Sequence, residues 1–340
     1  MSPTGRELVG QALRFQDPAR APRQLWYLPW AEIHYPDALH RIQETFPADI
    51  VSAPGFYRDP LPSRGCATGI GAYTDEFGCE FINIQEGVIG EVKHPRIRDW
   101  DNDAGAVRFP VEHFTMDREK INAWCASRDE FVVAGCCPRP FEQLQFLRGS
   151  ADLYVDLMLR PESMLAFMRA LHEFYCRLME EWAKTEVDAL TFMDDWGSQR
   201  SLLICPDLWR ELFKPMYRDY IEIAHSAGKA IFMHSDGHIL DIFPDLVELG
   251  LDAVNSQVFC MGVDNLAPFA GQITFWGEID RQGILSQGMP GDAREAVRQV
   301  YRHLWKKGGC IAQCEFGPGA RPETVEAVFS EWDAVAARSS

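Results

Sequence analysis

The stretch that decides the fold is Lys229-Ala-Ile-Phe-Met-His-Ser-Asp-Gly237. Its apolar first half ends abruptly in polar residues, which is typical of a strand that is buried on both faces. Amphipathic helices are predicted on either side, over residues 206–226 and 238–249. Strands that alternate with helices form parallel sheets, and ligand-binding residues lie where such strands end. His234 and Asp236 are two residues apart on an extended chain, so their side chains point the same way.

Seven further apolar runs have the same character. They cover residues 24–29, 49–54, 131–137, 188–193, 253–257, 272–280 and 310–315. Predicted helices separate most of these runs. Eight such units predict a closed (β/α)₈ TIM barrel that forms a single domain over residues 1–340, with the active site at the carboxyl ends of its strands. An open doubly wound sheet is the alternative, but no G-x-G-x-x-G segment follows the first strand, which counts against dinucleotide binding.

Residues 55–110 interrupt this alternation. Segments 69–78 and 81–92 alternate apolar and polar residues around glycines, which predicts antiparallel β-hairpins inserted after the second strand. The insertion could cap one mouth of the barrel or form a subunit contact in a homodimer.

Composition limits the partners. The chain has 340 residues, a net charge of −17 and acidic residues spread along its length, which argues against binding to nucleic acid or anionic membranes. No apolar run reaches the ~18 residues of a membrane span. The N-terminal residues lead straight into a polar helix without a signal peptide. Ten cysteines show no secreted-type framework, so we expect a cytoplasmic protein with reduced thiols.

The strand-end side chains are expected to meet at the mouth of the barrel. The candidates are Arg139, Asp194, Asp195, His234, Asp236, Asn255, Gln257, Glu278, Asp280, Cys314 and Glu315. They supply one imidazole, one thiol and several carboxylates. Neither a Ser-His-Asp arrangement with a nucleophile elbow nor a phosphate loop is present.

His234, Asp236 and Cys314 form the strongest combination for a metal. A catalytic zinc takes about three protein ligands with nitrogen, sulfur or oxygen donors and keeps one position open. A neutral imidazole, a thiolate and a carboxylate would leave the site electrically neutral. The alternative is that Cys314 only packs in the core and that His234 only forms a hydrogen bond with a carboxylate.

Three acids are candidates for catalysis. Asp194 and Asp195 follow the fourth strand and point to opposite sides, so one should face the barrel mouth as a metal ligand or a general acid/base. The alternative is a structural acid that pairs with an arginine or caps a helix. Glu278 follows an apolar segment that could raise its pKa and make it an acid. A salt bridge to Arg281 is the alternative for Glu278.

The remaining candidates would bind substrate. Arg139 lies between two prolines and could hold a substrate carboxylate, unless it is only a solvated surface residue. Asn255 and Gln257 end the sixth strand. Trp196 and Trp276 could line an apolar pocket, although such aromatics are also typical of a core.

Five segments carry a resemblance to a known family. They are Phe141-Glu-Gln-Leu-Gln-Phe-Leu-Arg-Gly149, Asp194-Asp-Trp-Gly197, Lys229 to Gly237, Phe275-Trp-Gly-Glu-Ile-Asp280 and Cys314-Glu-Phe-Gly317. The chain resembles the superfamily of uroporphyrinogen decarboxylase and the zinc-dependent corrinoid (methylcobalamin) methyltransferases, which are (β/α)₈ barrels. In the methyltransferase branch a His-x-Cys-Gly segment and a distant Cys bind zinc. The resemblance implies His234 and Cys314 as ligands here, with Asp236 in place of the near Cys.

The methyltransferase branch fits the chain better. The decarboxylases hold a substrate with many carboxylates by an Arg-rich N-terminal segment, whereas residues 21–27 contain one Arg. The resemblance implies a zinc-dependent methyltransferase that moves a methyl group between a small substrate and a corrinoid (cobalamin) cofactor carried by a partner protein. The hard oxygen of Asp236 favours demethylation of an O-methyl ether. The alternatives are a metal-free decarboxylase or lyase with Asp195 as acid/base, and a non-catalytic metabolite-binding barrel.

Overall fold

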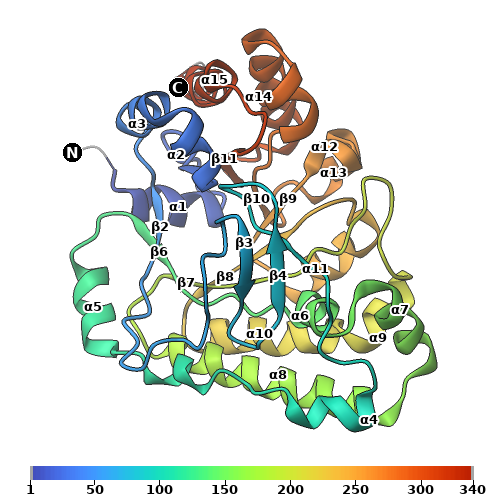
Figure 1. Ribbon diagram of the computed structural model, residues 1–340. Coiled ribbons are helices and arrows are strands. Elements are labelled where there is room, and N and C mark those ends of the chain that lie inside the picture. Colours follow the sequence, from blue (N-terminus) through green and yellow to red (C-terminus); the bar gives the residue numbers. More distant parts are fainter. Residues whose placement is uncertain (1–2, 338–340) are drawn as a thin grey trace.

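The computed structural model describes residues 3–337, and its centre is a barrel of eight parallel strands (Figure 1). The strands are β1 (Arg23–Tyr27), β2 (Ile50–Ser52), β6 (Phe131–Val133), β7 (Ala189–Met193), β8 (Ala230–Ser235), β9 (Ala253–Ser256), β10 (Thr274–Trp276) and β11 (Cys310–Phe316). They are bonded in the order β1, β11, β10, β9, β8, β7, β6, β2. Across the remaining gap the Asp49 N–H donates to the Arg23 carbonyl at 2.8 Å. The predicted (β/α)₈ barrel is confirmed. Met1 and Ser2 of the expected N-terminal segment lie outside the described residues.

Helices cover the outside of the barrel. They are α1 (Gly5–Leu13), α2 (Pro29–His34), α3 (Pro36–Thr45), α4 (Trp100–Asp103), α5 (Arg118–Ala126), α6 (Pro140–Arg148), α7 (Ser150–Leu159), α8 (Glu162–Ala183), α9 (Pro206–Leu212), α10 (Lys214–Ser226), α11 (Phe243–Leu249), α12 (Val258–Met261), α13 (Val263–Leu266), α14 (Pro290–Leu304) and α15 (Pro322–Ala337). Within residues 3–337 no helix is long and apolar enough to cross a membrane.

Prolines explain where the structure departs from two predicted helices. The helix expected over 206–226 is split into α9 and α10 at Phe213, just before Pro215. The helix expected over 238–249 begins as α11 only at Phe243, followed by Pro244. Proline has no N–H to donate and restricts the residue before it, so it is tolerated in the first turn of a helix and not in the interior.

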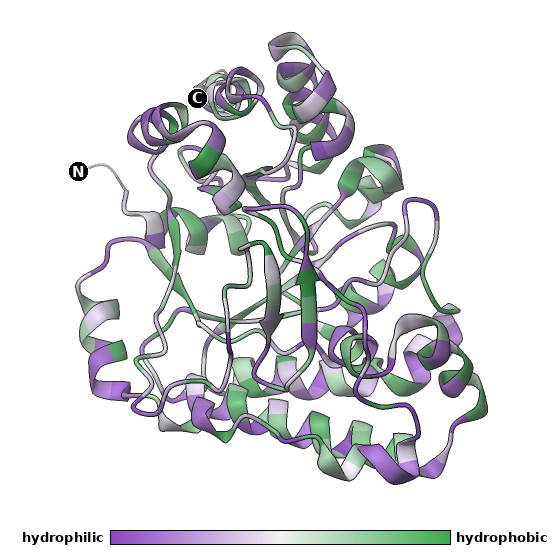
Figure 2. Cartoon of the chain, in the orientation of Figure 1, coloured by the Kyte–Doolittle hydropathy of each residue, from purple (hydrophilic) through white to green (hydrophobic). Residues whose placement is uncertain are grey.

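Alternation along the strands divides the apolar residues into two cores. One fills the barrel and consists of Val9, Ile50, Phe131, Val133, Ala189, Phe232, Ala253, Trp276 and Ile311. The strand neighbours of these residues, such as Val132, Ile231 and Val254, belong to the larger core between the strands and the helices. Figure 2 shows hydrophilic and hydrophobic residues alternating along outer helices such as α8, as expected for helices with one buried face. The same alternation decides which polar side chains face the inside of the barrel.

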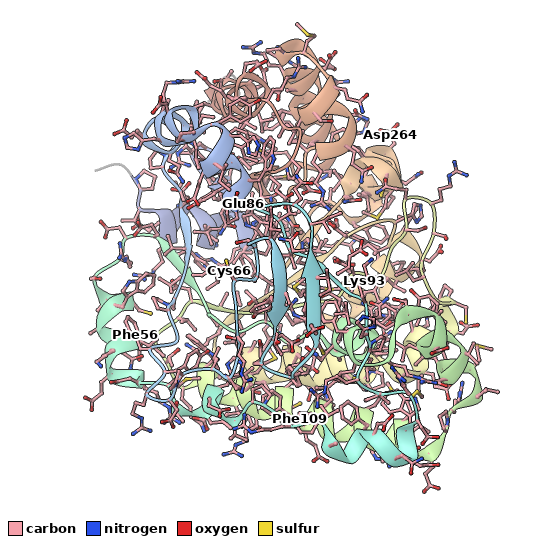
Figure 3. The ribbon with its side chains drawn as sticks, in the orientation of Figure 1. Phe56, Cys66, Glu86, Lys93, Phe109 and Asp264 are labelled. Carbon is pink, nitrogen blue, oxygen red and sulfur yellow. The ribbon has the colours of Figure 1, made fainter. Side chains whose placement is uncertain are left out.

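The predicted hairpins form a separate antiparallel sheet. Its strands are β3 (Gly71–Thr74), β4 (Glu80–Asn83) and β5 (Glu91–Val92), in the order β3-β4-β5. In the view of Figure 1 the sheet lies in front of the barrel, and Figure 3 labels Cys66, Glu86 and Lys93 around it. Phe81 on β4 packs against Phe146 on α6, with ring centroids 5.0 Å apart. The inserted sheet is therefore joined to the barrel on the side of its mouth.

Candidate metal centre at the carboxyl ends of the strands

Three potential metal ligands converge at the ends of two neighbouring strands. His234 is on β8, Asp236 follows β8, and Asp195 follows β7. The His234 Nε2 atom lies 3.5 Å from Asp195 Oδ1 and 3.8 Å from Asp236 Oδ1. One donor atom from each residue falls within 4.8 Å of the other two. The parallel pairing of Met193 with His234 places both strand ends at the same level of the barrel.

Two glycines bring the ligand-bearing loops into backbone contact. Gly197 N–H donates to the Asp236 carbonyl at 3.1 Å, and His238 N–H donates to the Ser198 carbonyl at 2.7 Å. A Cβ atom on Gly237 would lie 2.0 Å from the Gly197 carbonyl oxygen, and the φ of Gly237 is +79°. Only glycine allows this approach and this conformation without strain. The Asp236 N–H also donates to Asp195 Oδ1 at 2.9 Å, so the main chain sets the spacing of the two carboxylates.

Asn255 orients the imidazole. The side-chain oxygen of Asn255 lies 2.6 Å from His234 Nδ1, and its amide nitrogen donates to the Trp276 carbonyl. Because the Asn255 oxygen can only accept, Nδ1 must carry the proton, which leaves Nε2 of a neutral ring as a free electron-pair donor. Metal-binding histidines usually have such a partner on the second nitrogen. The imidazole is therefore held in the tautomer that a metal requires.

Asp236 has one oxygen with a partner and one without. Oδ2 is bonded to Arg281, whereas Oδ1 is buried and has no hydrogen-bond partner among residues 3–337. Arg281 also contacts Glu278 at 3.4 Å and Glu315 at 3.3 Å. A buried oxygen of a charged carboxylate without a partner is costly. A cation between Oδ1, His234 Nε2 and Asp195 would supply the missing partner.

The surroundings of these three residues are rich in carboxyl groups. Burial raises the pKa of Glu278 to about 8, and neighbouring acids, including Asp236, add to the rise. Burial likewise raises the pKa of Glu142 to about 7, and the charge of Arg139 partly opposes this. A bound dication would offset the repulsion among these groups.

The donor set fits a divalent metal with nitrogen and oxygen ligands. One neutral imidazole and two carboxylates suit zinc, and three protein ligands leave a position open for substrate. Glu142 lines the same hollow as Asp195 and Asp236, here called the cleft. Its Oε2 atom is buried, lies 3.6 Å from Arg139 Nη1 and has no hydrogen-bond partner in the part of the chain that the structure describes.

The structure corrects the expected role of Cys314. Its side chain is fully buried in the core between the barrel and the helices, where it pairs in register with Leu25. Burial raises the pKa of the Cys314 thiol well above its usual range. Within residues 3–337, neither cluster of potential metal ligands includes Cys314. The expected set of His234, Asp236 and Cys314 is replaced by Asp195, His234 and Asp236.

Asp194 and Trp196 also point away from the barrel mouth. The buried Asp194 carboxylate accepts hydrogen bonds from the Phe141 and Glu142 N–H groups at the start of α6, at 2.9 and 2.8 Å. Trp196 is fully buried, stacks on Phe141 with ring centroids 4.1 Å apart and donates to the Tyr217 hydroxyl at 2.7 Å. Both side chains hold α6 and α10 to the barrel, which is the structural alternative to their expected catalytic and substrate-binding roles.

The other candidates have different positions. Gln257 lines the cleft and accepts a hydrogen bond from the Gln199 side chain at 3.1 Å. Arg139 precedes α6 and lies 3.6 Å from Glu142. Asp280 accepts hydrogen bonds from the N–H groups of the turn that follows it. Glu315 faces Arg281, as described above. Gln257 thus lines the cleft, Arg139 and Glu315 contact residues that line it, and Asp280 has a capping role.

Sequence reasoning missed two residues of the cleft. Glu142 lies on a helix and not at a strand end, so a search limited to strand ends does not find it. Its only signal was its place inside the family-like segment 141–149. Arg281 was considered only as the partner of Glu278, yet it bridges three carboxylates.

Two hollows meet this centre. The larger one is the cleft, which has a volume of about 640 Å³ and is lined by charged side chains and by the inserted sheet. Its charged residues are Glu91, Glu142, Asp195, Asp236 and Arg281. The second, here called the inner cavity, has a volume of about 380 Å³ and is lined by His234, Trp26, Trp276, Val133, Met193 and other uncharged residues. Both indole N–H groups donate to Gln24 Oε1, at 3.0 and 2.9 Å, so neither is free for a ligand. His234 therefore lines an uncharged cavity, while its neighbours Asp195 and Asp236 line the charged cleft.

A barrel with a cluster of metal-ligand side chains at the carboxyl ends of its strands is the arrangement of an enzyme site. The sequence model of the uroporphyrinogen decarboxylase (URO-D) family matches residues 73–335, and the chain belongs to this family. The resemblance seen in the sequence is confirmed.

A solved structure shares the fold. A methyltransferase from Methanosarcina mazei aligns with a TM-score of 0.66 and 16% identity, over 98% of this chain and 99% of that one. An endo-β-1,4-xylanase from Gloeophyllum trabeum aligns with a TM-score of 0.45 and 11% identity, over 95% of this chain and 99% of that one. No curated protein sequence matches the chain.

Proposed function

We propose that this protein is a metal-dependent methyltransferase that moves a methyl group between a small neutral substrate and a corrinoid carried by a partner protein. The observation that supports it most is the convergence of Asp195, His234 and Asp236, with a buried Asp236 oxygen that has no hydrogen-bond partner. The shared fold of the methyltransferase from Methanosarcina mazei supports a test of methyl transfer.

His234, Asp195 and Asp236 would hold the metal, for which zinc is the first candidate. When bound, zinc would polarise the leaving oxygen of an O-methyl substrate or lower the pKa of an acceptor thiol, and the corrinoid would accept or supply the methyl group. Asn255 orients the His234 ring, and Arg281 neutralises the second oxygen of Asp236. The chain's own residues thus keep one imidazole nitrogen and two carboxylates directed at one point.

The inner cavity suggests how a substrate is placed. Its walls include Trp26, Trp276, Val133 and Met193, and none of the described residues that line it is an acid, a lysine or an arginine. An apolar substrate body in this cavity would put a methyl-bearing oxygen next to His234 and the methyl group towards the cleft. A neutral O-methyl ether fits this arrangement better than a carboxylate, because a charge would be buried without a partner.

The cleft offers a proton for the leaving oxygen. Breaking the methyl–oxygen bond leaves the electron pair on the oxygen, which then needs a proton. Glu142 lines the cleft, and its raised pKa of about 7 keeps a large share of its carboxyl groups protonated near neutral pH. Glu142 can therefore donate this proton, as a general acid does.

Charge in the cleft argues against a substrate with many carboxylates. Of the charged residues that line it, four are acids and only Arg281 is basic. Arg281 is engaged by three carboxylates, and Arg139 lies beside Glu142. A porphyrinogen-like polyanion would meet repulsion here, which favours methyl transfer over decarboxylation.

Metal content is the first test. Purified wild type made with zinc present should contain stoichiometric zinc, and His234→Ala and Asp236→Asn should each hold one ion fewer than wild type. Asp280→Asn is the matched control, because Asp280 caps a turn and is not one of the three ligands. Absence of metal from the wild type, or full metal content in Asp236→Asn, would contradict the proposed centre.

Activity is the second test. Methylation of free reduced cobalamin by neutral O-methyl ethers should require zinc and should fall in Glu142→Gln. Filling the inner cavity with Val133→Trp should raise KM for bulky ethers more than for methanol. Turnover of a carboxylate substrate by metal-free enzyme, together with no methyl transfer, would favour the decarboxylase alternative.

A further inference from the structure

A second cluster of potential metal ligands lies outside the barrel, between two helices. His172 and Cys176 are one turn apart on α8, and Asp219 comes from α10. His172 Nε2 lies 2.8 Å from Asp219 Oδ2 and 3.5 Å from Cys176 Sγ. The donor atoms of the three residues lie within 4.8 Å of one another.

These separations are close to those of ligands around one zinc ion. With Zn–N near 2.1 Å and Zn–S near 2.3 Å, a tetrahedral site separates nitrogen from sulfur by about 3.6 Å. The nitrogen–oxygen separation in such a site is about 3.4 Å, so the Asp219 carboxylate would have to move outwards by roughly half an ångström. Its side chain is 51% exposed and has room to do so.

The surroundings favour a cation. The Tyr220 hydroxyl lies 3.3 Å from His172 Nδ1, and it can orient the ring as a second partner does in metal sites. Glu173, Glu180 and Asp219 lie close enough to act electrostatically on the Cys176 thiol. A negative local field of this kind attracts a divalent ion.

We propose that His172, Cys176 and Asp219 bind a zinc-class ion that clamps α8 to α10. One nitrogen, one sulfur and one oxygen donor match zinc better than magnesium or calcium, which take oxygen ligands only. Binding would displace the Cys176 proton, because the thiolate is the ligand. The helices that it joins lead into β7 and β8, the strands that carry Asp195 and His234. The clamp would be structural, and it does not depend on the proposed methyltransferase activity.

Cobalt(II) in place of zinc distinguishes the two centres, because only the helix cluster contains sulfur. Metal-free wild type titrated with cobalt should develop the near-ultraviolet absorption of a cobalt–thiolate bond. Cys176→Ser should remove this absorption and bind one ion fewer, and Cys260→Ser should keep it. Cys260 is the matched control because it lines a pocket with Glu278 and Arg281, close to the barrel centre. Loss of the band in Cys260→Ser, or its survival in Cys176→Ser, would overturn the proposal.

Thermal stability provides an independent measurement. In an Asp195→Asn/Asp236→Asn double variant, which lacks two donors of the barrel centre, added zinc should still raise Tm in a concentration-dependent way. Adding Cys176→Ser should abolish this rise, while the Tm without metal checks that the variant folds. If zinc has no effect on the double variant while the wild type binds it, the helix clamp fails and the barrel centre stands. If the double variant binds as much zinc as wild type, the helix clamp stands and the barrel centre fails.

Discussion

Cys314 and Glu315 are neighbours on β11, yet their side chains lie on opposite sides of the barrel wall. Cys314 is in register with Leu25 and is buried against the helices, whereas Glu315 is in register with Trp26 and reaches Arg281. Alternation along a strand enforces this separation. Neighbouring residues of a motif at a strand end therefore face different sides: one side chain faces the interior of the barrel and the next faces the outer core.

Replacement of Cys314 tests this assignment. We expect Cys314→Ala to keep full zinc content and to lower stability by about 1 kcal/mol, because a buried sulfur atom is lost from a packed core. Metal analysis and denaturant unfolding measure the two effects. Loss of zinc from a folded Cys314→Ala protein would restore the ligand set expected from the sequence.

Removal of the Asn255 amide should weaken metal binding without removing a ligand. Asn255→Leu has a similar volume but leaves His234 Nδ1 without its acceptor, so zinc affinity should fall about 10–100-fold. Competition with a chelator measures this affinity. Gln257→Leu removes an amide that bonds only Gln199 and should leave the affinity unchanged; equal losses in both variants would contradict the role of Asn255.

Glu278 should make stability fall as pH rises. Its pKa is raised from an ordinary value of 4.5 to about 8, so between these values the folded protein keeps a proton that the unfolded chain has released. The stabilisation is complete below pH 4.5 and is lost as pH approaches 8, with a slope of at most about 1.4 kcal/mol per pH unit.

Glu278→Gln should flatten this dependence. The variant should gain stability over wild type at pH 8 and show less of a gain at pH 5, in metal-free protein followed by urea unfolding. Glu119→Gln, on the exposed surface of α5, should keep the wild-type slope. Parallel pH profiles for wild type and Glu278→Gln would rule out the raised pKa.

Gly237→Ala should disrupt the metal centre by displacing the main chain of the two loops. The new Cβ would overlap the Gly197 carbonyl and would sit at a positive φ. We expect the free energy of unfolding to fall by about 2 kcal/mol or more and zinc binding to be impaired. Gly228→Ala is the control, because it also has a positive φ but meets no atom within 4 Å. If the two variants behave alike, the clash at Gly197 is not what matters.

The order of the strands and the position of His234 and Asp236 could be predicted from the sequence. Apolar runs that end in polar residues mark the strands, and a spacing of two keeps both side chains on the inner face. The same rule shows that Glu315 and Cys314 cannot both face inwards. Which of the two faces inwards follows only from the structure, where Ile311 lies inside the barrel and Cys314 outside it.

The rest of the centre depends on contacts that have no local signal. Asp194 and Asp195 differ in role because the start of α6 and Tyr217 lie on one side of the loop and His234 on the other. Glu142 reaches the cleft because Asp194, just after β7, binds the N–H groups at the start of α6. Such pairings between distant segments follow from the tertiary arrangement and not from residue spacing.

Because main-chain contact between Gly197 and Gly237 fixes the distance between the loops, donor chemistry and donor spacing can be altered independently. Asp236→Cys would exchange a hard oxygen for a soft sulfur at the same place on the scaffold. The site thus offers a way to tune metal preference by single side-chain exchanges, leaving the architecture around it intact.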